Sequence, residues 1–225
     1  MSADGNPPPP APVTVTRTGE GGTVASEAEM TGGVLSGPVA SYHANGAKAE
    51  TARFKDGKLE GERVQYDPAG RVLARMSFRD GLLDGPMTVY AEGRKLAEMP
   101  YVKGVLEGEM RSYDAAGRLK SITPYKQGKL DGVMQVFHPN GARLREASYK
   151  AGLLDGEAVD YWESGAVRQR ARWRADLLDG PLASYHENGA VNEEAVFAEG
   201  KPVSRRQAPQ PKPAKKSWID KAFGG

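Results

Sequence analysis

The chain has 225 residues, a formal net charge of +2 and no cysteine, which excludes disulfides, thiolate catalysis and cysteine-based zinc sites. Its 39% hydrophobic content and mean hydropathy of −0.58 favour a thin, hydrated, repetitive fold over a deep globular core. No apolar stretch approaches about 18 residues, and no basic region precedes an apolar run at the N-terminus. We therefore expect no transmembrane span, no secretory signal and a cytoplasmic location, with signal-independent export left open.

The first segment, residues 1–21, is predicted to be a disordered leader, because its run of prolines at 7–10 favours an extended, solvated chain. A half-repeat follows from Gly22, and its Val24, Ala28 and Met30 occupy positions that are apolar in the repeats below. Met30 stands where the complete repeats carry an aromatic residue, as expected of a cap at the end of an array.

Residues 22–203 contain an in-register repeat, in which the triplet Leu-x-Gly returns seven times. The leucines of these triplets are Leu35, Leu59, Leu83, Leu106, Leu130, Leu154 and Leu178. They are 24 residues apart, except for one gap of 23 between Leu83 and Leu106. A fixed period of this length predicts a stacked array, here of about seven and a half units. Because arrays contact their partners over long surfaces, the repeat favours a binding protein over an enzyme.

Two columns of aromatic residues recur when each repeat is numbered from the residue two places before its leucine. Position 10 holds Tyr42, Tyr66, Tyr90, Tyr113, Phe137, Tyr161 and Tyr185. Position 22 holds Phe54, Phe78, Tyr101, Tyr125, Tyr149, Trp173 and Phe197. Position 14 is always glycine, as in Asn45-Gly46, and Asn-Gly favours a hairpin turn because both residues tolerate a positive φ.

The runs between these turns have the length of strands, so the sequence predicts an all-β fold. The expected architecture is an elongated antiparallel β-meander of tandem 24-residue hairpin repeats with roughly 15 strands and disordered tails. In the second run of a hairpin, Val72, Met76 and Phe78 are interleaved with polar residues, which predicts one buried face that holds all three and one hydrated face.

Two irregularities are expected within the strands. Met87 and Tyr90 are three residues apart in a first run, so a bulge or a change of register is predicted there. Pro100 and Pro124 carry no amide donor for a ladder, and we expect a bulge or an early strand end at each of them.

The C-terminal region differs from the array in charge and composition. Residues 204–216 are predicted to be a basic, Pro-rich linker, and 217–225 a short amphipathic segment in which Trp218 and Phe223 share one face of a helix. Residues 201–225 carry a charge of +6, whereas residues 33–200 carry −1. The array is therefore not a nucleic-acid surface by its charge.

The polar residues do not form a metal site in this arrangement. The three histidines, His43, His138 and His186, follow the position-10 aromatic residues, and one repeat advances about 9.6 Å, so His138 and His186 should lie about 19 Å apart. They are predicted to be solvated turn residues. The acidic residues of the triplets are Glu60, Asp84, Glu107, Asp131, Asp155 and Asp179. One carboxylate per repeat cannot supply the oxygens that calcium needs, so we expect each acid to stabilise its own turn and expect no cofactor.

The aromatic columns are the remaining candidates for function, since no nucleophile or phosphate-binding motif occurs. A sheet of one layer leaves an apolar face to be covered by its own curling, by a tail, by a second copy or by a partner. The candidate protein-binding residues are Tyr90, Tyr113, Phe137, Tyr161, Tyr185, Trp218 and Phe223. The alternative is that these residues only stabilise the sheet through cross-strand contacts.

The stretch from Gly128-Lys129-Leu130-Asp131-Gly132 through Asn140-Gly141 to Tyr149 resembles the bacterial MORN-variant repeat. This repeat is typical of the YwqK family of toxin–antitoxin system antitoxins, and the resemblance extends over about residues 22–203. It implies an extended meander of hairpins and a role in binding and neutralising, or accompanying, a toxin protein.

Three hypotheses follow for the function. The first is a non-enzymatic protein of immunity type that covers a toxin or effector protein. The second is an accessory or scaffold protein, tethered through its C-terminal tail to a larger assembly such as a secretion system. The third is peripheral membrane binding, which the near-neutral array disfavours. The oligomeric state is left open.

Overall fold

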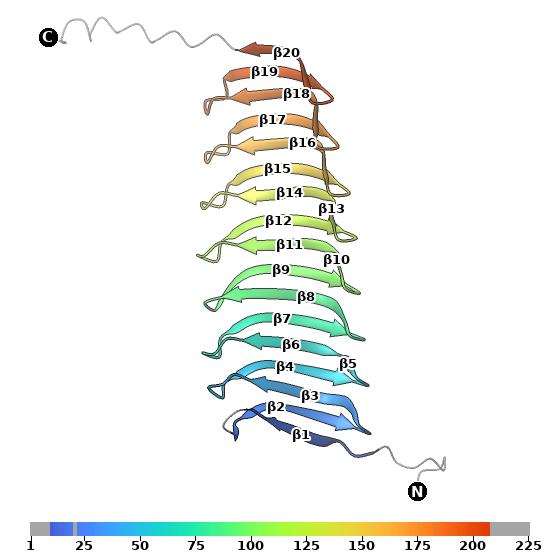
Figure 1. Ribbon diagram of the computed structural model, residues 1–225. Helices are drawn as coiled ribbons and strands as arrows, with labels where there is room; N and C mark the ends of the chain where they lie inside the picture. Colours follow the sequence, from blue (N-terminus) through green and yellow to red (C-terminus); the bar gives the residue numbers. More distant parts are fainter. Residues whose placement is uncertain (1–9, 20–21, 208–225) are drawn as a thin grey trace, which may run out of the picture.

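The computed structural model describes residues 10–19 and 22–207, and within them the regular elements are β-strands arranged as an elongated ladder (Figure 1). The strands of the first half are β1 (Val13–Thr18), β2 (Val24–Thr31), β3 (Val34–Tyr42), β4 (Lys48–Lys55), β5 (Lys58–Leu59), β6 (Gly61–Tyr66), β7 (Val72–Arg79), β8 (Leu82–Ala91), β9 (Arg94–Val102) and β10 (Val105–Leu106). Those of the second half are β11 (Gly108–Tyr113), β12 (Leu119–Lys126), β13 (Lys129–Leu130), β14 (Gly132–Phe137), β15 (Arg143–Lys150), β16 (Leu153–Tyr161), β17 (Val167–Arg174), β18 (Leu177–Tyr185), β19 (Val191–Ala198) and β20 (Lys201–Gln207).

The strands pair antiparallel in chain order, so the predicted all-β meander is confirmed as one open sheet. The short strands β5, β10 and β13 each share a partner with the strand that follows; β12, for example, pairs with both β13 and β14. Counting each such pair as one leaves 17 strands in the described residues, against roughly 15 expected.

The two additional strands lie at the ends of the sheet, where the expected boundaries were wrong. The predicted disordered leader 1–21 contains β1, which pairs with β2 through Val13 opposite Met30 and Val15 opposite Ala28. Its alternation of valine and threonine suits a strand that has only one neighbour. At the other end β20 continues to Gln207, four residues into the predicted linker, because an edge strand tolerates Pro202. The remaining predicted tail segments, 1–9, 208–216 and 217–225, lie outside the described residues.

The Leu-x-Gly triplet braces each tight turn to the next one. The carbonyl of Leu130 accepts a hydrogen bond from the amide of Gly152 at 2.8 Å, and the carboxylate of Asp131 accepts one from the amide of Ala151 at 3.0 Å. The same carboxylate contact recurs at Glu60, Glu107 and Asp155. The acid was expected to stabilise its own turn; its carboxylate instead reaches the turn one repeat further on.

The glycine of the triplet has no room for a side chain. At Gly132 φ is +120°, and a Cβ there would lie 3.0 Å from Cγ of Pro124. At Gly156 φ is +122°, and a Cβ would lie 2.8 Å from Cβ of Ser148. Both the backbone conformation and the close neighbour require glycine.

The expectation for the two prolines was wrong, because β9 runs through Pro100 and β12 through Pro124. The irregularity lies in the following strand instead. The amides of Glu107 and Asp131 donate to the carbonyls of the prolines at 3.0 Å, at the points where β10 gives way to β11 and β13 to β14. Each proline carbonyl therefore accepts a hydrogen bond at the point where the following strand is interrupted. The missing N–H of the proline leaves no backbone acceptor unpaired there.

The predicted bulge in the first run is confirmed. Across β7 and β8 the register shifts between Met76 opposite Met87 and Phe78 opposite Leu83, and across β8 and β9 it shifts again at Tyr90. Register shifts of this kind recur beside the position-10 aromatic residue in the complete repeats.

One of these bulges overturns the placement of Val72 on the same face as Met76 and Phe78. Val72 pairs with Tyr66, whereas Ala74 pairs with Gln65. Since Gln65 and Tyr66 are neighbours in one strand, they point to opposite faces, and so do Val72 and Ala74. The alternation from Ala74 to Phe78 is as expected, with Ala74 and Met76 buried.

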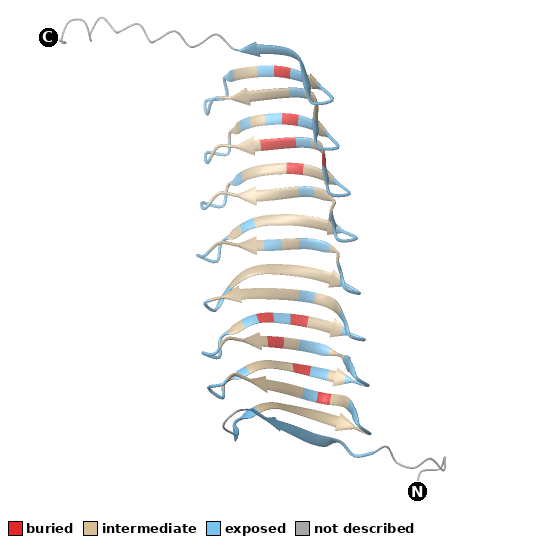
Figure 2. Ribbon diagram, viewed as in Figure 1, coloured by how far each residue is buried: buried red, intermediate tan, exposed pale blue. Residues whose placement is uncertain are grey.

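The sheet has two faces of different composition. On one face Ala147 is fully buried and packs with Leu154 and Ala158, and Tyr149 and Trp173 lie against them. We call this the leucine face. The hydroxyl of Tyr161 donates to Glu146, which precedes Ala147 in β15, so the position-10 column lies on the opposite face, the tyrosine face. Figure 2 shows the buried residues as short segments in the middle of strands, as expected of a single layer.

Candidate binding surface

The five candidate tyrosine and phenylalanine residues within the array form one column on the tyrosine face. They are Tyr90, Tyr113, Phe137, Tyr161 and Tyr185, at the C-terminal ends of β8, β11, β14, β16 and β18. All five are half-buried, so they are not the exposed aromatic strip that a partner would meet first. The two tail candidates, Trp218 and Phe223, lie outside the described residues.

Several tyrosines in this column bind a carboxylate of the preceding repeat. The hydroxyl of Tyr113 donates to Glu98 at 2.8 Å, and that of Tyr161 donates to Glu146 at 2.8 Å. The ammonium group of Lys95 binds Glu98 and also lies 5.7 Å from the centre of the Tyr113 ring. These contacts make the column a repeat-to-repeat connection, which is the structural alternative to partner contact.

The same contacts perturb the ionisation of both partners. Burial and the hydrogen bond to Glu98 raise the pKa of Tyr113, and burial and Glu146 raise the pKa of Tyr161. Hydrogen bonds from Lys95 and Tyr113 lower the pKa of Glu98. Burial opposes the shift at Glu146, but hydrogen bonds from Gln135 and Tyr161 outweigh it and lower its pKa. The carboxylates are thus held ionised as acceptors and the phenols neutral as donors.

Two of the three loop histidines, His43 and His138, are structural rather than solvated. The ring Nε2–H of His43 donates to the carbonyl of Tyr66 at 3.0 Å, and that of His138 donates to the carbonyl of Tyr161 at 3.3 Å. Each bond reaches the next repeat, and both rings are half-buried. His186 is exposed. In the described part of the chain, no three His, Asp or Glu residues are grouped in a way that could hold a metal ion.

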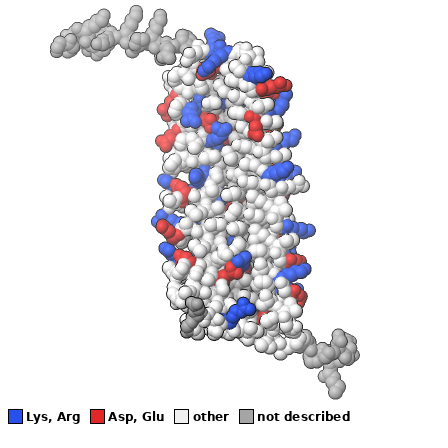
Figure 3. Space-filling view, in the orientation of Figure 1, with Lys and Arg blue, Asp and Glu red and all other residues white. Residues whose placement is uncertain are grey.

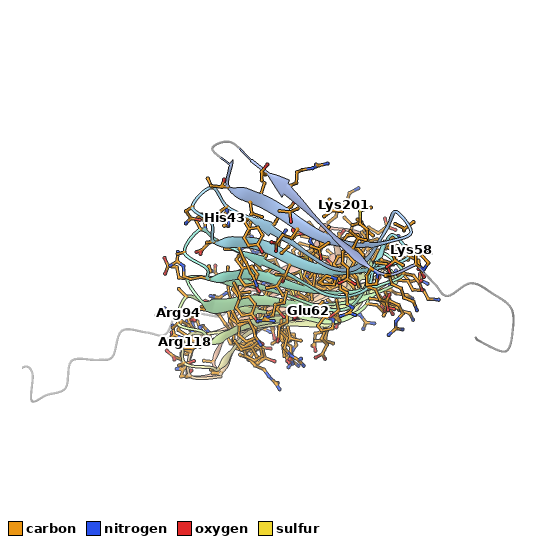
Figure 4. The ribbon with its side chains drawn as sticks, turned by 90° about the horizontal axis from the view of Figure 1, so that it is seen from below. His43, Lys58, Glu62, Arg94, Arg118 and Lys201 are labelled. Atoms are coloured by element: carbon orange, nitrogen blue, oxygen red, sulfur yellow. The ribbon has the colours of Figure 1, made fainter. Side chains whose placement is uncertain are left out.

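An exposed aliphatic ridge runs along the opposite long edge, where the tight turns lie. It consists of the position-2 residues that follow the turns, on the tyrosine face. Its aliphatic members are Val34, Leu82, Val105, Leu153 and Leu177, and Lys58, Lys129 and Lys201 occupy the same position in other repeats. We call this set the turn ridge. Figure 4 shows Lys58 at this edge, across the sheet from His43, Arg94 and Arg118, and Figure 3 shows Lys and Arg side chains projecting along it.

Sequence reasoning did not identify the turn ridge, although its signal is present. Position 2 holds only valine, leucine or lysine in every repeat. The residue lies between the turn glycine and the leucine of the triplet, so it was interpreted as part of the turn rather than as a surface position. Only the register shows that position 2 lies on the tyrosine face and position 3 on the leucine face.

A shallow hollow also lies on the tyrosine face near its C-terminal end. It is lined by Glu157, Arg170, Arg172, Pro181 and Tyr185, among others. Arg170 and Glu157 form an ion pair at 3.1 Å across it. Tyr185 therefore borders an open depression on this face.

Comparison with known proteins agrees with this architecture. A family model described as a MORN repeat variant matches residues 106–127 and 130–151. Each matched segment spans one hairpin unit, from the leucine of a triplet to the residue before the next tight-turn glycine. The chain therefore carries MORN-variant repeats. No curated protein matches the chain.

MORN repeats are generally protein- or membrane-binding modules. Within the described residues, no helix is long and apolar enough to cross a membrane.

Proposed function

We propose that this chain is a non-enzymatic binding protein that recognises a toxin or effector protein and neutralises it by covering the surface that the toxin uses. The proposal rests on the difference between the side chains that bind neighbouring repeats and those that remain exposed. Tyrosine, glutamate and loop histidine side chains are engaged between repeats, whereas the turn ridge leaves aliphatic and lysine side chains directed outward.

The dimensions of the array suit this role. One repeat advances about 9.6 Å, and a strand of eight residues is about 27 Å long, so one face of a repeat offers about 260 Å². A standard protein interface takes about 800 Å² from each partner. Three to four repeats are therefore enough for one partner, and neutralisation by covering needs no catalytic residue.

Affinity capture with the full-length protein from lysate of its native host, followed by mass spectrometry, tests the proposal. A single stoichiometric partner that is toxic when expressed alone, and harmless when co-expressed with this chain, is the expected result. Recovery of no stoichiometric partner, or of a partner whose toxicity is unchanged by co-expression, contradicts it.

The tethered scaffold is the second candidate, and it is supported by the basic composition of the C-terminal tail. The structure sharpens its test, because β20 extends to Gln207 and a deletion must begin at residue 208 to leave the sheet intact. Loss of several subunits of one assembly from the capture after this deletion favours the scaffold. Retention of a single toxic partner favours neutralisation.

A further inference from the structure

We propose that the edge formed by three successive tight turns, which includes Val105, Lys129 and Leu153 of the turn ridge, is the docking site for an acidic, aliphatic segment of the protein partner. The turns join β9 to β10, β12 to β13 and β15 to β16. The inference deepens the proposed function and rests on it, since it assigns the partner's contact to one edge of the array and states its chemistry.

The aliphatic part of this site is exposed in spite of its size. Val102 and Val105 pair directly across the first of the three turns and are 49% and 44% exposed. Leu153 in the third turn is 45% exposed, and Val133, in the strand after the second turn, is 51% exposed. On the leucine face, by contrast, residues of similar size are half-buried or buried against one another. Aliphatic side chains gathered at this level of exposure are typical of a contact surface.

The cationic part consists of Lys103, Lys126, Lys129 and Lys150. Lys126 and Lys129 are directly opposite each other across the second turn. Like charges in this arrangement destabilise a hairpin, and an anionic group placed between them would relieve the repulsion. The ammonium groups of these four lysines make no ion pair or hydrogen bond with another described residue.

The turns on either side differ in how their charges are paired. Arg79 binds Asp84 at 3.4 Å, and Arg174 binds Asp179 at 2.9 Å. The acids nearest to the lysine cluster are occupied differently: Glu107 accepts the amide of Gln127 at 2.6 Å, and Asp131 accepts that of Ala151. The carboxylates in the centre therefore serve the backbone, and the lysines there are available to a partner.

The limits of the cluster indicate what kind of partner fits. The three turns span two repeats, or about 19 Å. The turns beyond them contain Asp80 and Asp176, and residues 33–200 have a charge of −1 in total. An extended anionic surface such as a lipid bilayer would meet these acids, whereas a short acidic segment would not. A helix of about 13 residues covers 19 Å.

The test uses the full-length protein and a dye-labelled helical peptide of about 14 residues, composed of leucine on one face and glutamate on the others. Two control peptides replace leucine with serine or glutamate with lysine. Fluorescence anisotropy should show saturable binding of the leucine–glutamate peptide, weakened by salt, and at least about tenfold weaker binding of both controls.

Two variants locate the binding. Lys126→Glu with Lys129→Glu should weaken it by at least about tenfold, because it removes the cation pair. Lys55→Glu with Lys58→Glu is the matched control, since these lysines are also directly opposite each other in a tight turn, one that contains Asp56 and lies outside the site. It should change binding by less than about twofold. Val105→Ser with Leu153→Ser should weaken binding by about fivefold, and both residues are exposed enough that folding should be unaffected.

The results separate this inference from the proposed function. Equal losses in the two lysine variants, or no saturable peptide binding, overturn the docking site, and so does sedimentation of the protein with phosphatidylserine vesicles when the peptide does not bind. If wild-type protein captures its toxic partner and the Lys126→Glu/Lys129→Glu variant captures it equally well, the docking site is wrong while the proposed function stands. If no toxic partner is found, the proposed function fails, and the peptide result then decides only the chemistry of this edge.

Discussion

The two long edges of the sheet are both bonded from repeat to repeat, but they use different groups. On the loop edge the side chains themselves make the connection: Nδ2 of Asn45 donates to the carbonyl of Pro68 at 2.8 Å, and a guanidinium nitrogen of Arg94 donates to that of Ala115 at 2.6 Å. On the turn edge the connection runs through backbone amides, a leucine carbonyl and the carboxylate of the residue after that leucine, as at Leu130 and Asp131.

This difference decides which edge is available to a partner. The loop edge uses side chains such as His43, Asn45 and Arg94 to hold neighbouring repeats together. The turn edge holds the array with the leucine carbonyls and the acidic side chains of the triplets. The turn residues themselves, such as Lys126 and Lys129, therefore point outward. The turn edge is therefore the one that leaves side chains such as Lys126 and Lys129 available to a partner.

The largest effect should come from adding a methyl group to the brace on the turn edge. Gly156→Ala is expected to lower the free energy of unfolding by about 3 kcal/mol, because φ is +122° and the new Cβ would lie 2.8 Å from Cβ of Ser148. Gly165→Ala on the loop edge is the control. Its φ is +85° and nothing lies within 4 Å, so a loss of about 1 kcal/mol is expected. Urea denaturation of both variants measures the difference, and equal losses would show that the brace is not tightly packed.

A smaller effect should follow from removing one hydrogen-bonding side chain on each edge. Asp131→Ala leaves the amide of Ala151 without its carboxylate and should cost about 1 kcal/mol. Asn140→Ala removes two exposed hydrogen bonds: Nδ2 donates to the carbonyl of Glu163 at 3.3 Å, and Oδ1 accepts from the amide of Ala142. Because water can replace both partners, the loss should be about 0.5 kcal/mol. Asp131→Asn, which keeps an acceptor oxygen, should fall between Asp131→Ala and wild type in urea midpoint. A larger loss for Asn140→Ala than for Asp131→Ala would reverse the comparison.

Much of the fold could be predicted because the same turn residues and aromatic positions recur in seven repeats. The hairpins, the strand lengths and the aromatic columns follow from turn residues and from period-two alternation. The faces could not be assigned in this way, because a bulge inserts one residue and reverses every side chain beyond it. Val72 was placed wrongly for this reason, and the turn ridge was missed for a related one.

The ends and the exceptions depend on pairing, which a single repeat does not encode. β1 and β20 carry neither the triplet nor the aromatic columns, and they are strands because β2 and β19 offer them an edge. Asp176 stands where the other tight turns have glycine and adopts a φ of +66°. Its carboxylate accepts the amide of Leu154 at 2.7 Å, a contact that offsets the strain and that only the structure shows.

The smallest expected effect is a pH dependence that separates the loops closed by aspartate from those closed by asparagine. In two loops an aspartate replaces asparagine as the acceptor, and hydrogen bonds from the backbone amides of Arg71 and Arg118 lower the pKa of Asp67 and Asp114 below the usual 3.8. A carboxyl whose pKa is lowered by folding stabilises the fold above pH 3.8, and this contribution is lost as the pH falls through the folded-state pKa. NMR titration of the Arg71 and Arg118 amide shifts should therefore give midpoints below 3.8.

The asparagine loops supply the control for this titration, since the amide of Ala142 is bound by Asn140, which does not ionise in this range. Its shift should stay flat over the same acid range. Asp67→Asn should flatten the shift of Arg71 and leave that of Arg118 unchanged. A midpoint at or above 3.8 for Arg71 would mean that the carboxylate of Asp67 does not hold its loop in solution, and the loop edge would then depend on its cross-repeat contacts alone.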